Sequence, residues 1–339
     1  MPGKIPLLSD GALTTVSCET LLRSVPERVS RVSSPLSRLP LYVVRDIFSL
    51  GRPSQAFCLR DPEQDRFYLL QESWGYDIES FLLATVKSLR NATDGVCGVL
   101  AEAAPLCFVW AGNFWHWIFE GLARVAVLES QGFRGAYIVP PSDIATETMD
   151  ILRIPRRRII LGTQPYFIKK LYVSAHMPPD KFTPGTMEAL TALRNFLHPR
   201  IPRLPAKKRC YIKRIYTRKI QNESEVIAML DPMGFEVMVP EEQPGIFSQL
   251  VYMSNVECSV MPHGANCALA FAQPPGSHFF ELFGRGYVNH CNGPMAEVAG
   301  LHSHQLVEKS AEPMAFDPNG DYDVDVDFLS SMLRKILEI

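Results

Sequence analysis

Three prolines in the segment 198–205 interrupt this chain of 339 residues where strand and helix patterns stop and then restart. Closely spaced prolines favour a stiff, extended connector and cannot continue a helix. A chain of this length also exceeds the usual size of one hydrophobic core. Because short apolar strands alternate with helices on both sides of the connector, we expect two α/β layered domains, each with a mainly parallel sheet.

Apolar runs and helical periodicity locate the expected elements. Before the connector we expect strands at 41–44, 67–70, 135–140, 158–161 and 170–175, a strand or loop entry at 105–110, and helices at 113–132, 145–152 and 187–196. After it we expect strands at 209–212, 234–239, 256–261 and 278–283, with helices at 223–230, 244–253, from 268 onward, and at 328–337. The predicted domains are residues 1–197 and 206–312, followed by a segment 313–339 whose helix packs back on the first domain.

Composition narrows the class of protein. With a formal net charge of -2, the chain gives no overall electrostatic reason to bind nucleic acid. Its apolar stretches fall short of the roughly 20 residues that span a membrane, and residues 1–10 lack the pattern of a signal peptide. Eight cysteines are scattered without a C-x-x-C pair, which favours reduced, mostly buried thiols. We therefore expect a soluble protein that acts in the cytoplasm or at the inner face of the membrane.

Small residues follow the strand expected at 256–261, in the order His263, Gly264, Ala265. Small residues at a strand–helix turn let a ligand approach the backbone, and the N-terminus of a helix attracts phosphate through its N–H groups and dipole. His263 adds a hydrogen-bond donor at the same turn. A tight turn capped by a histidine explains the same residues, and turn chemistry alone favours that simpler interpretation.

Charged side chains occur near other strand ends of the same domain. Lys213, Arg214, Arg218 and Lys219 follow the first expected strand, and arginine is suited to bidentate contact with phosphate. Glu281 lies toward the end of the strand 278–283, where a carboxylate can accept hydrogen bonds from both hydroxyls of a ribose. Taken one at a time, these residues are explained equally well as solvated surface charge.

An aromatic helix in the N-terminal half places a histidine and a carboxylate on one face. His116 and Glu120 are four residues apart, and Asn113 is the expected N-cap. An imidazole beside a carboxylate in apolar surroundings is suited to act as a general base. A core histidine with a local hydrogen bond is an equally good interpretation.

Known metal and dinucleotide motifs are incomplete in this sequence. The histidine at 116 has no second histidine at the spacing of an H-E-x-x-H zinc site, and the Gly284-Arg-Gly286 segment lacks a third glycine in register. The acidic run 321–327 lacks the glycine and the terminal glutamate of an EF-hand. It is expected to cap the helix 328–337.

Many short motifs occur in a recognisable order. They are the aromatic helix 113–124, Tyr211-Ile-Lys-Arg214, Arg218, Asn222-Glu223, Gly234-Phe235, Val239-Pro240-Glu241, Phe247-Ser-Gln249, Pro262-His-Gly-Ala265, Pro275-Gly276 and Phe280-Glu-Leu282. This order resembles glycosyltransferase family 61, whose bacterial members are often labelled capsular polysaccharide biosynthesis proteins. The resemblance covers residues 113–129 and 209–283, and the first hundred residues carry none that we can name.

The resemblance implies a GT-B fold, with two Rossmann-like domains facing a central cleft, and inverting sugar transfer without a bound metal or other cofactor. It implies that the C-terminal domain binds a nucleotide sugar, expected to be a UDP-sugar, through Arg214, Arg218, Asn222, Glu223, His263, Gly264, Ala265, Asn266 and Glu281. It also implies that the N-terminal domain binds a glycan or glycolipid acceptor through Asn113, Trp115 and Trp117, with His116 or Glu120 as the base. Inverting transfer needs such a base and a stabilised leaving group. The product would belong to a surface polysaccharide.

This sequence also departs from the family pattern. Where members commonly continue His-Gly-Ala-Gly-Leu-Thr-Asn, this chain has Asn266-Cys-Ala-Leu269. The departure motivates a second hypothesis, a nucleotide-sugar- or glycan-binding protein of a polysaccharide assembly system with altered catalysis. A third is a nucleotide-dependent enzyme of another kind, because a doubly wound fold does not fix function.

Overall fold

A computed structural model describes residues 13–16, 18–24, 26–32, 41–49, 57–61, 66–70, 98–106, 110–164, 166–174, 180–203, 205, 207–308 and 315–338. The chain forms two compact units. The first comprises Met1–Pro178 and Thr183–Leu193, and the second comprises Pro179–Phe182 and Arg194–Ile339. The chain passes from one to the other within helix α6 (Pro184–Leu197), so the connector 198–205 belongs to the second unit.

The first unit is built on a nine-stranded sheet. Its strands are β1 (Leu13–Val16), β2 (Val29–Val32), β3 (Leu41–Ser49), β4 (Phe57–Asp61), β5 (Arg66–Leu70), β6 (Gly98–Pro105), β7 (Ala136–Val139), β8 (Ile159–Leu161) and β9 (Tyr166–Ser174). Its helices are α1 (Cys18–Ser24), α3 (Phe114–His116), η2 (Trp117–Leu122), α4 (Ala123–Ser130), α5 (Asp143–Ile151), η3 (Arg156–Arg158) and the first part of α6. Residues 107–109 of the strand or loop entry expected at 105–110 lie outside the described residues.

Only part of this sheet is parallel. Strands β9, β6, β7 and β8 pair in parallel in that order, and β6 ends where the strand or loop entry at 105–110 was expected to begin. Strand β3 is antiparallel to β2, β4 and β9, and β4 is antiparallel to β5. Strand β1 is parallel to β5. The expectation of a mainly parallel sheet is nevertheless wrong for the strands described within residues 13–70, because their other pairs are antiparallel. The linker 62–65 between β4 and β5 is too short for the crossover that parallel neighbours require.

The second unit contains a five-stranded sheet in which every strand pair is parallel. Its strands are β10 (Lys208–Ile212), β11 (Phe235–Met238), β12 (Val256–Pro262), β13 (His278–Phe283) and β14 (His302–Val307). Its helices are η4 (His198–Arg200), α7 (Glu223–Leu230), η5 (Asp231–Met233), η6 (Pro240–Glu242), α8 (Ile246–Met253), η7 (Ala265–Ala272), α9 (Gly293–Ala299) and α10 (Val326–Leu337). Neither α9 nor β14 was expected from the sequence. Together the two units make this a mixed α/β protein.

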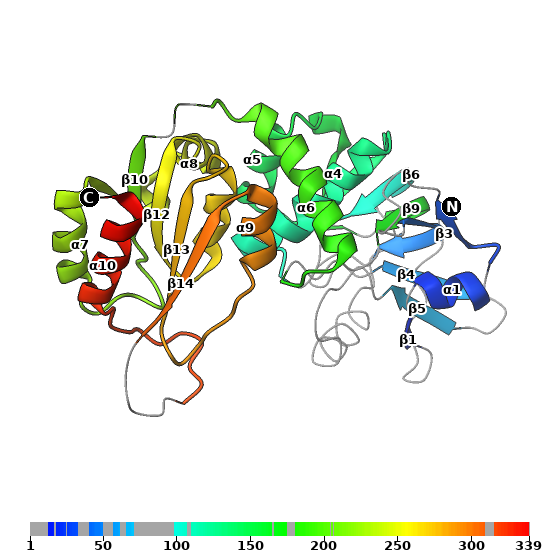
Figure 1. Ribbon diagram of the computed structural model, residues 1–339. Coiled ribbons are helices and arrows are strands. Elements are labelled where there is room, and N and C mark those ends of the chain that lie inside the picture. Colours follow the sequence, from blue (N-terminus) through cyan, green and yellow to red (C-terminus); the bar gives the residue numbers. More distant parts are fainter. Residues whose placement is uncertain are drawn as a thin grey trace. The chain divides into compact units, whose positions relative to one another are not determined.

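Helices cover both faces of this second sheet, with α7 and α10 along one face and α9 along the other (Figure 1). Leu230 of α7 and Leu333 of α10 join strand residues such as Val260 in one apolar cluster. Asp325 caps α10 by accepting a hydrogen bond from the Phe328 N–H at 2.9 Å, as the acidic run predicted. Helix α10 thus belongs to the core of the second unit, whereas we expected it to pack on the first domain.

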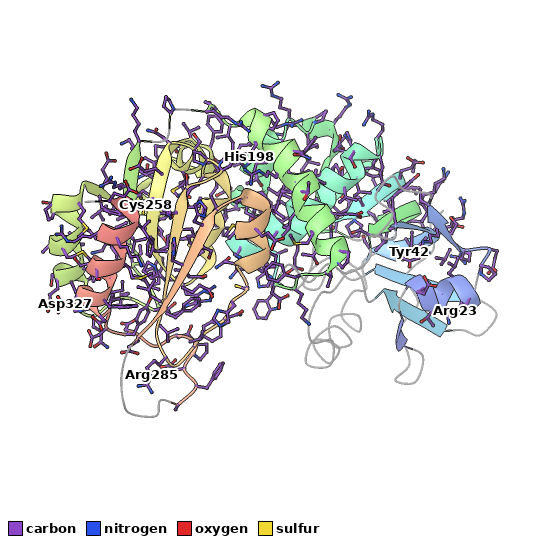
Figure 2. The ribbon with its side chains drawn as sticks, viewed as in Figure 1. Arg23, Tyr42, His198, Cys258, Arg285 and Asp327 are labelled. Carbon is purple, nitrogen blue, oxygen red and sulfur yellow. The ribbon has the colours of Figure 1, made fainter. Side chains whose placement is uncertain are left out.

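The cysteines of the second unit carry free thiols, and Cys210, Cys258 and Cys267 are buried. Cys258 lies within the sheet (Figure 2), where burial raises the pKa of its thiol to about 12. These residues confirm the prediction of reduced, buried thiols for this part of the chain. Among the described residues, no helix is both long and apolar enough to cross a membrane.

A cluster of histidines at the start of β13 and β14 makes the stability of the second unit depend on pH. Burial, together with His278 and His302, lowers the pKa of His304 to about 4. The unfolded chain binds a proton at this residue below about pH 6.5, whereas the folded chain does not until about pH 4. The free energy of unfolding should therefore decrease as the pH is lowered from about 6.5 to about 4.

We expect the fall to be smaller in a His304→Gln variant, which cannot titrate there. Thermal melts of both proteins at pH 5 and pH 7.5 measure the difference. An equal decrease in Tm for the two proteins would contradict the assignment.

Candidate functional site

The strand order of the second unit creates a switch point at the carboxyl ends of β10 and β12. From β10 the chain passes through α7 to β11 on one side, and then through α8 to β12 on the other side. The connections that leave the two neighbouring strands diverge, and open α/β sheets bind ligands in the crevice at such a point. The loop 213–222 after β10 and the turn 263–264 after β12 begin there.

Arg214 packs directly against the turn after β12. Its Nε donates a hydrogen bond to the Thr217 carbonyl at 2.8 Å, and a Cβ on Gly264 would lie 1.5 Å from its Nη1. Gly264 therefore leaves the space that the Arg214 guanidinium occupies. Burial, and secondarily Arg218, lower the pKa of Arg214. Both effects penalise its positive charge, so an anion in the crevice would stabilise it.

Arg218 lies near enough to Arg214 to affect its pKa, and its backbone conformation is strained. Its φ of 56° lies in the left-handed region, which costs a non-glycine residue about 1–2 kcal/mol. Its guanidinium carbon lies 5.5 Å from the centre of the Tyr287 ring. Its Nε is buried without a hydrogen-bond partner among the described residues. Backbone strain and unsatisfied buried donors both concentrate at functional sites.

The neighbouring lysines differ from these arginines in having acidic partners. Lys213 Nζ lies 2.6 Å from a Glu223 carboxylate oxygen, and Lys219 Nζ lies 3.6 Å from one of Asp321. Within the described ranges, neither Arg214 nor Arg218 forms an ion pair. The protein thus neutralises the lysines and leaves the charge of the two arginines for an anionic ligand.

His263 follows β12 directly and connects this cationic crevice to a buried carboxylate. Its Nδ1 lies 2.6 Å from Glu281 Oε1, and its ring stacks on Phe283 with the centroids 4.8 Å apart. A small pocket adjoins the ring, and its lining includes His263, Arg218, Tyr287, Tyr322, Gly286 and Asp317. Two of the cationic or hydrogen-bonding groups implied by the resemblance therefore share one pocket.

Glu281 does not present its carboxylate to this pocket as a ribose contact would require. The side chain is fully buried. Oε1 accepts hydrogen bonds from His263 and from Asn292 Nδ2 at 2.6 Å, and Oε2 accepts one from Gln305 Nε2 at 3.3 Å. Protein donors therefore occupy the oxygens that a ribose diol would use.

Two other residues assigned to the nucleotide by resemblance have structural partners at the start of α7. The Asn222 side chain forms hydrogen bonds with both the N–H and the carbonyl of Val324. Glu223 accepts a hydrogen bond from the Tyr211 hydroxyl at 2.9 Å in addition to its ion pair with Lys213. These contacts connect the first strand to α7 and to the segment before α10, so both side chains stabilise the fold of the site.

The segment after Gly264 differs from the expected helix. Residues Ala265–Ala272 form a 3-10 helix, whose tighter turns are closed by hydrogen bonds between residues three apart. The first of these bonds runs from the Cys267 N–H to the Gly264 carbonyl at 3.0 Å. Asn266 projects toward Glu241, with 3.5 Å between its Nδ2 and the carboxylate. Ala265 is the first residue of this helix, which therefore begins three residues before the position expected from the sequence.

In the first unit, His116 and Glu120 form the close pair that their spacing predicted. The distance from Nδ1 to Oε1 is 2.5 Å, and the Glu120 side chain is only 1% exposed. Oε2 of Glu120 is buried and has no hydrogen-bond partner in the described part of the chain. Asn113 is the N-cap, as expected, and accepts hydrogen bonds from the N–H groups of Trp115 and His116. The ring of His116 is thus held through Nδ1, and Nε2 is the nitrogen directed away from the carboxylate.

A π-helical turn, η2, interrupts this helix at Glu120. Gly121 allows the turn to pack, because a Cβ there would lie 2.6 Å from Cε3 of Trp117. Single π-helical turns occur often at functional sites. The buried carboxylate and the irregular turn therefore mark the same position in the first unit.

An exposed aromatic ring beside His116 belongs to Trp110, a residue that was not among those expected at the site. Trp110 stacks on His116 with the centroids 6.0 Å apart and is 50% exposed. Trp115 and Trp117 are buried, and Trp117 donates a hydrogen bond to Thr148 Oγ1 at 2.7 Å. Trp110 is therefore the accessible platform, and the two tryptophans expected to contact the acceptor are core residues. The sequence signal for Trp110 was its place in the turn just before the N-cap Asn113, where a side chain can be exposed next to His116.

Comparison with protein families finds a match for part of the chain. No curated protein matches the sequence. The family model described as Glycosyltransferase 61 matches residues 114–280, a range that contains the His116–Glu120 pair and the Arg214, Arg218 and His263 cluster. This agrees with the resemblance drawn from the order of the motifs. Residues 114–280 of this chain are therefore similar in sequence to glycosyltransferase family 61.

Proposed function

We propose that this protein is an inverting, metal-independent glycosyltransferase that uses a nucleotide-diphosphate sugar, a UDP-sugar in the first instance, to extend a glycan or glycolipid. One observation carries the proposal. At the switch point of the second unit, Arg214 and Arg218 have no acidic partner among the described residues, and His263 adjoins them. A diphosphate needs such groups, and the family match supports the sugar-nucleotide context.

The proposed chemistry divides between leaving group and nucleophile. As the acceptor oxygen bonds to the anomeric carbon, the bond from that carbon to the diphosphate breaks, and negative charge develops on the diphosphate. Fixed guanidinium groups stabilise that charge without a metal. The acceptor hydroxyl loses its proton to His116 Nε2, and the buried Glu120 carboxylate stabilises the resulting imidazolium.

The GT-B arrangement, hexosyl or pentosyl transfer, and synthesis of a bacterial surface polysaccharide at the cytoplasmic face of the membrane form the wider part of this proposal. They rest on the family resemblance. In this proposal the first unit binds the acceptor, and Trp110 provides the surface on which a sugar ring stacks. The second unit binds the donor.

A nucleoside diphosphate should stabilise the protein if this proposal is right. At a UDP concentration about 100 times its Kd, the free energy of unfolding should rise by about 2.7 kcal/mol, which thermal melts would detect. Sugar transfer should continue in EDTA, because no metal stabilises the leaving group. The absence of any shift with UDP, GDP or dTDP would contradict nucleotide binding. A shift without turnover of any nucleotide sugar would instead favour the catalytically altered binding protein.

A further inference from the structure

Glu281 is a buried carboxylate with a set of partners that serves His263. Glu281 is fully buried, and the His263 side chain is 5% exposed. The carboxylate oxygens accept hydrogen bonds from His263 Nδ1 at 2.6 Å, Asn292 at 2.6 Å and Gln305 at 3.3 Å. A charged carboxylate is costly to bury unless donors surround it in this way.

These contacts fix which nitrogen of His263 carries a proton. An ionised carboxylate only accepts hydrogen bonds, so Nδ1 must be the donor. Phe283 stacks on the ring at 4.8 Å, and Tyr287 lies tilted against it at 5.5 Å. With Nδ1 directed at Glu281 and the aromatic rings against its sides, the ring has its Nε2 edge toward the pocket that it shares with Arg218.

The charge of the ring then depends on what occupies the pocket. A phosphate oxygen also only accepts hydrogen bonds, so Nε2 must donate to it. Both ring nitrogens donate only when the imidazole carries two protons and a positive charge. Glu281 is the buried counterion placed for that charge.

We propose that Glu281 is a positioning residue which holds His263 for proton-coupled binding of a diphosphate: the ligand enters as His263 Nε2 takes up one proton. This inference rests on the function proposed above. The proton comes from solvent, Nδ1–H stays bonded to Glu281, and no covalent bond other than Nε2–H forms. Product release would return the proton.

Isothermal titration calorimetry of the full chain with UDP, and separately with pyrophosphate, tests this coupling. Titrations in two buffers of different ionisation enthalpy, at intervals from about pH 6 to about pH 9, count the protons taken up. We expect binding of UDP or pyrophosphate to take up close to about one proton at some pH within this range. Where that is so, the affinity should weaken about tenfold for each unit by which the pH is raised.

Two variants identify the groups. The glutamine of His263→Gln can still donate a hydrogen bond but cannot take up a proton, so the proton uptake by this residue should be lost. Any uptake that remains in this variant belongs to the ligand itself. Glu281→Gln keeps the shape of the side chain and removes the counterion, so uptake should move to lower pH. The ¹⁵N shifts of His263 should report Nδ1–H in the unliganded wild-type protein.

The outcomes separate this inference from the proposed function. UDP binding without proton uptake anywhere in the range would overturn the inference and leave nucleotide binding intact. Uptake that persists in His263→Gln at the wild-type level would overturn it as well, because another group would then be titrating. Absence of binding by both probes would overturn the inference and the proposed function together. If His263→Gln fails to fold, the ¹⁵N shifts of His263 in the UDP-bound wild-type protein identify the group, and a neutral ring in that state would overturn the inference.

Discussion

Replacing His116 by glutamine is expected to lower kcat for sugar transfer by about 10²- to 10⁴-fold, the usual contribution of a general base. The residue is poised for this role because its Nδ1 is held at 2.5 Å by the buried Glu120 and its ring is partly exposed beside Trp110. Glutamine cannot accept the proton of the acceptor hydroxyl. Steady-state kinetics with a nucleotide sugar and acceptor would measure the loss.

Glu120→Gln provides the matched comparison. It keeps a hydrogen-bonding group of the same shape at position 120 but no longer stabilises an imidazolium, so kcat should fall less than in His116→Gln. The affinity for UDP should stay at the wild-type value in both variants, which separates a lost base from a damaged fold. Full turnover in His116→Gln would remove this residue from the mechanism.

Arg218→Gly is expected to weaken UDP binding by about tenfold to a hundredfold without loss of stability. Hydrogen bonds to charged groups contribute about 1.5–3 kcal/mol, which sets the size of the effect. The backbone at 218 has a φ of 56°, which glycine adopts without strain. Calorimetry gives the affinity, and thermal melts should show a Tm equal to or above that of the wild-type protein.

Lys219→Ala is the control for this prediction, because it removes a cation from the same loop that already pairs with Asp321. Its effect on UDP binding should be small. Gly264→Ala tests the same site through Arg214, because the added Cβ would displace the Arg214 guanidinium and should weaken UDP binding. Gly98→Ala is its control, because a Cβ there makes only ordinary van der Waals contacts. Equal losses of affinity in Arg218→Gly and Lys219→Ala would indicate a nonspecific effect of positive charge and would contradict direct binding of UDP by Arg218.

The sequence predicted the second unit more closely than the first. The helix at 223–230 and the strand at 278–283 have the predicted bounds, because each is rich in apolar residues and is closely followed by a proline or a glycine. In the described part of the first hundred residues, β2, β3, β4 and β5 follow one another along the chain, and local pattern cannot say which strands pair. The antiparallel part of the first sheet was therefore missed.

Residue types and their order along the chain determined the family resemblance, the arginines and glycine of the crevice, and the pairing of His116 with Glu120, since these depend on local spacing. Only the tertiary structure decided which of these groups are accessible. It buried Trp115 and Trp117, exposed Trp110, and turned Glu281 from an expected ribose contact into the partner of His263. The reason is that β12 and β13 are neighbours in the sheet, which brings residues 18 positions apart into contact. Strand order and side-chain burial are properties of the packed chain, and no local pattern records them.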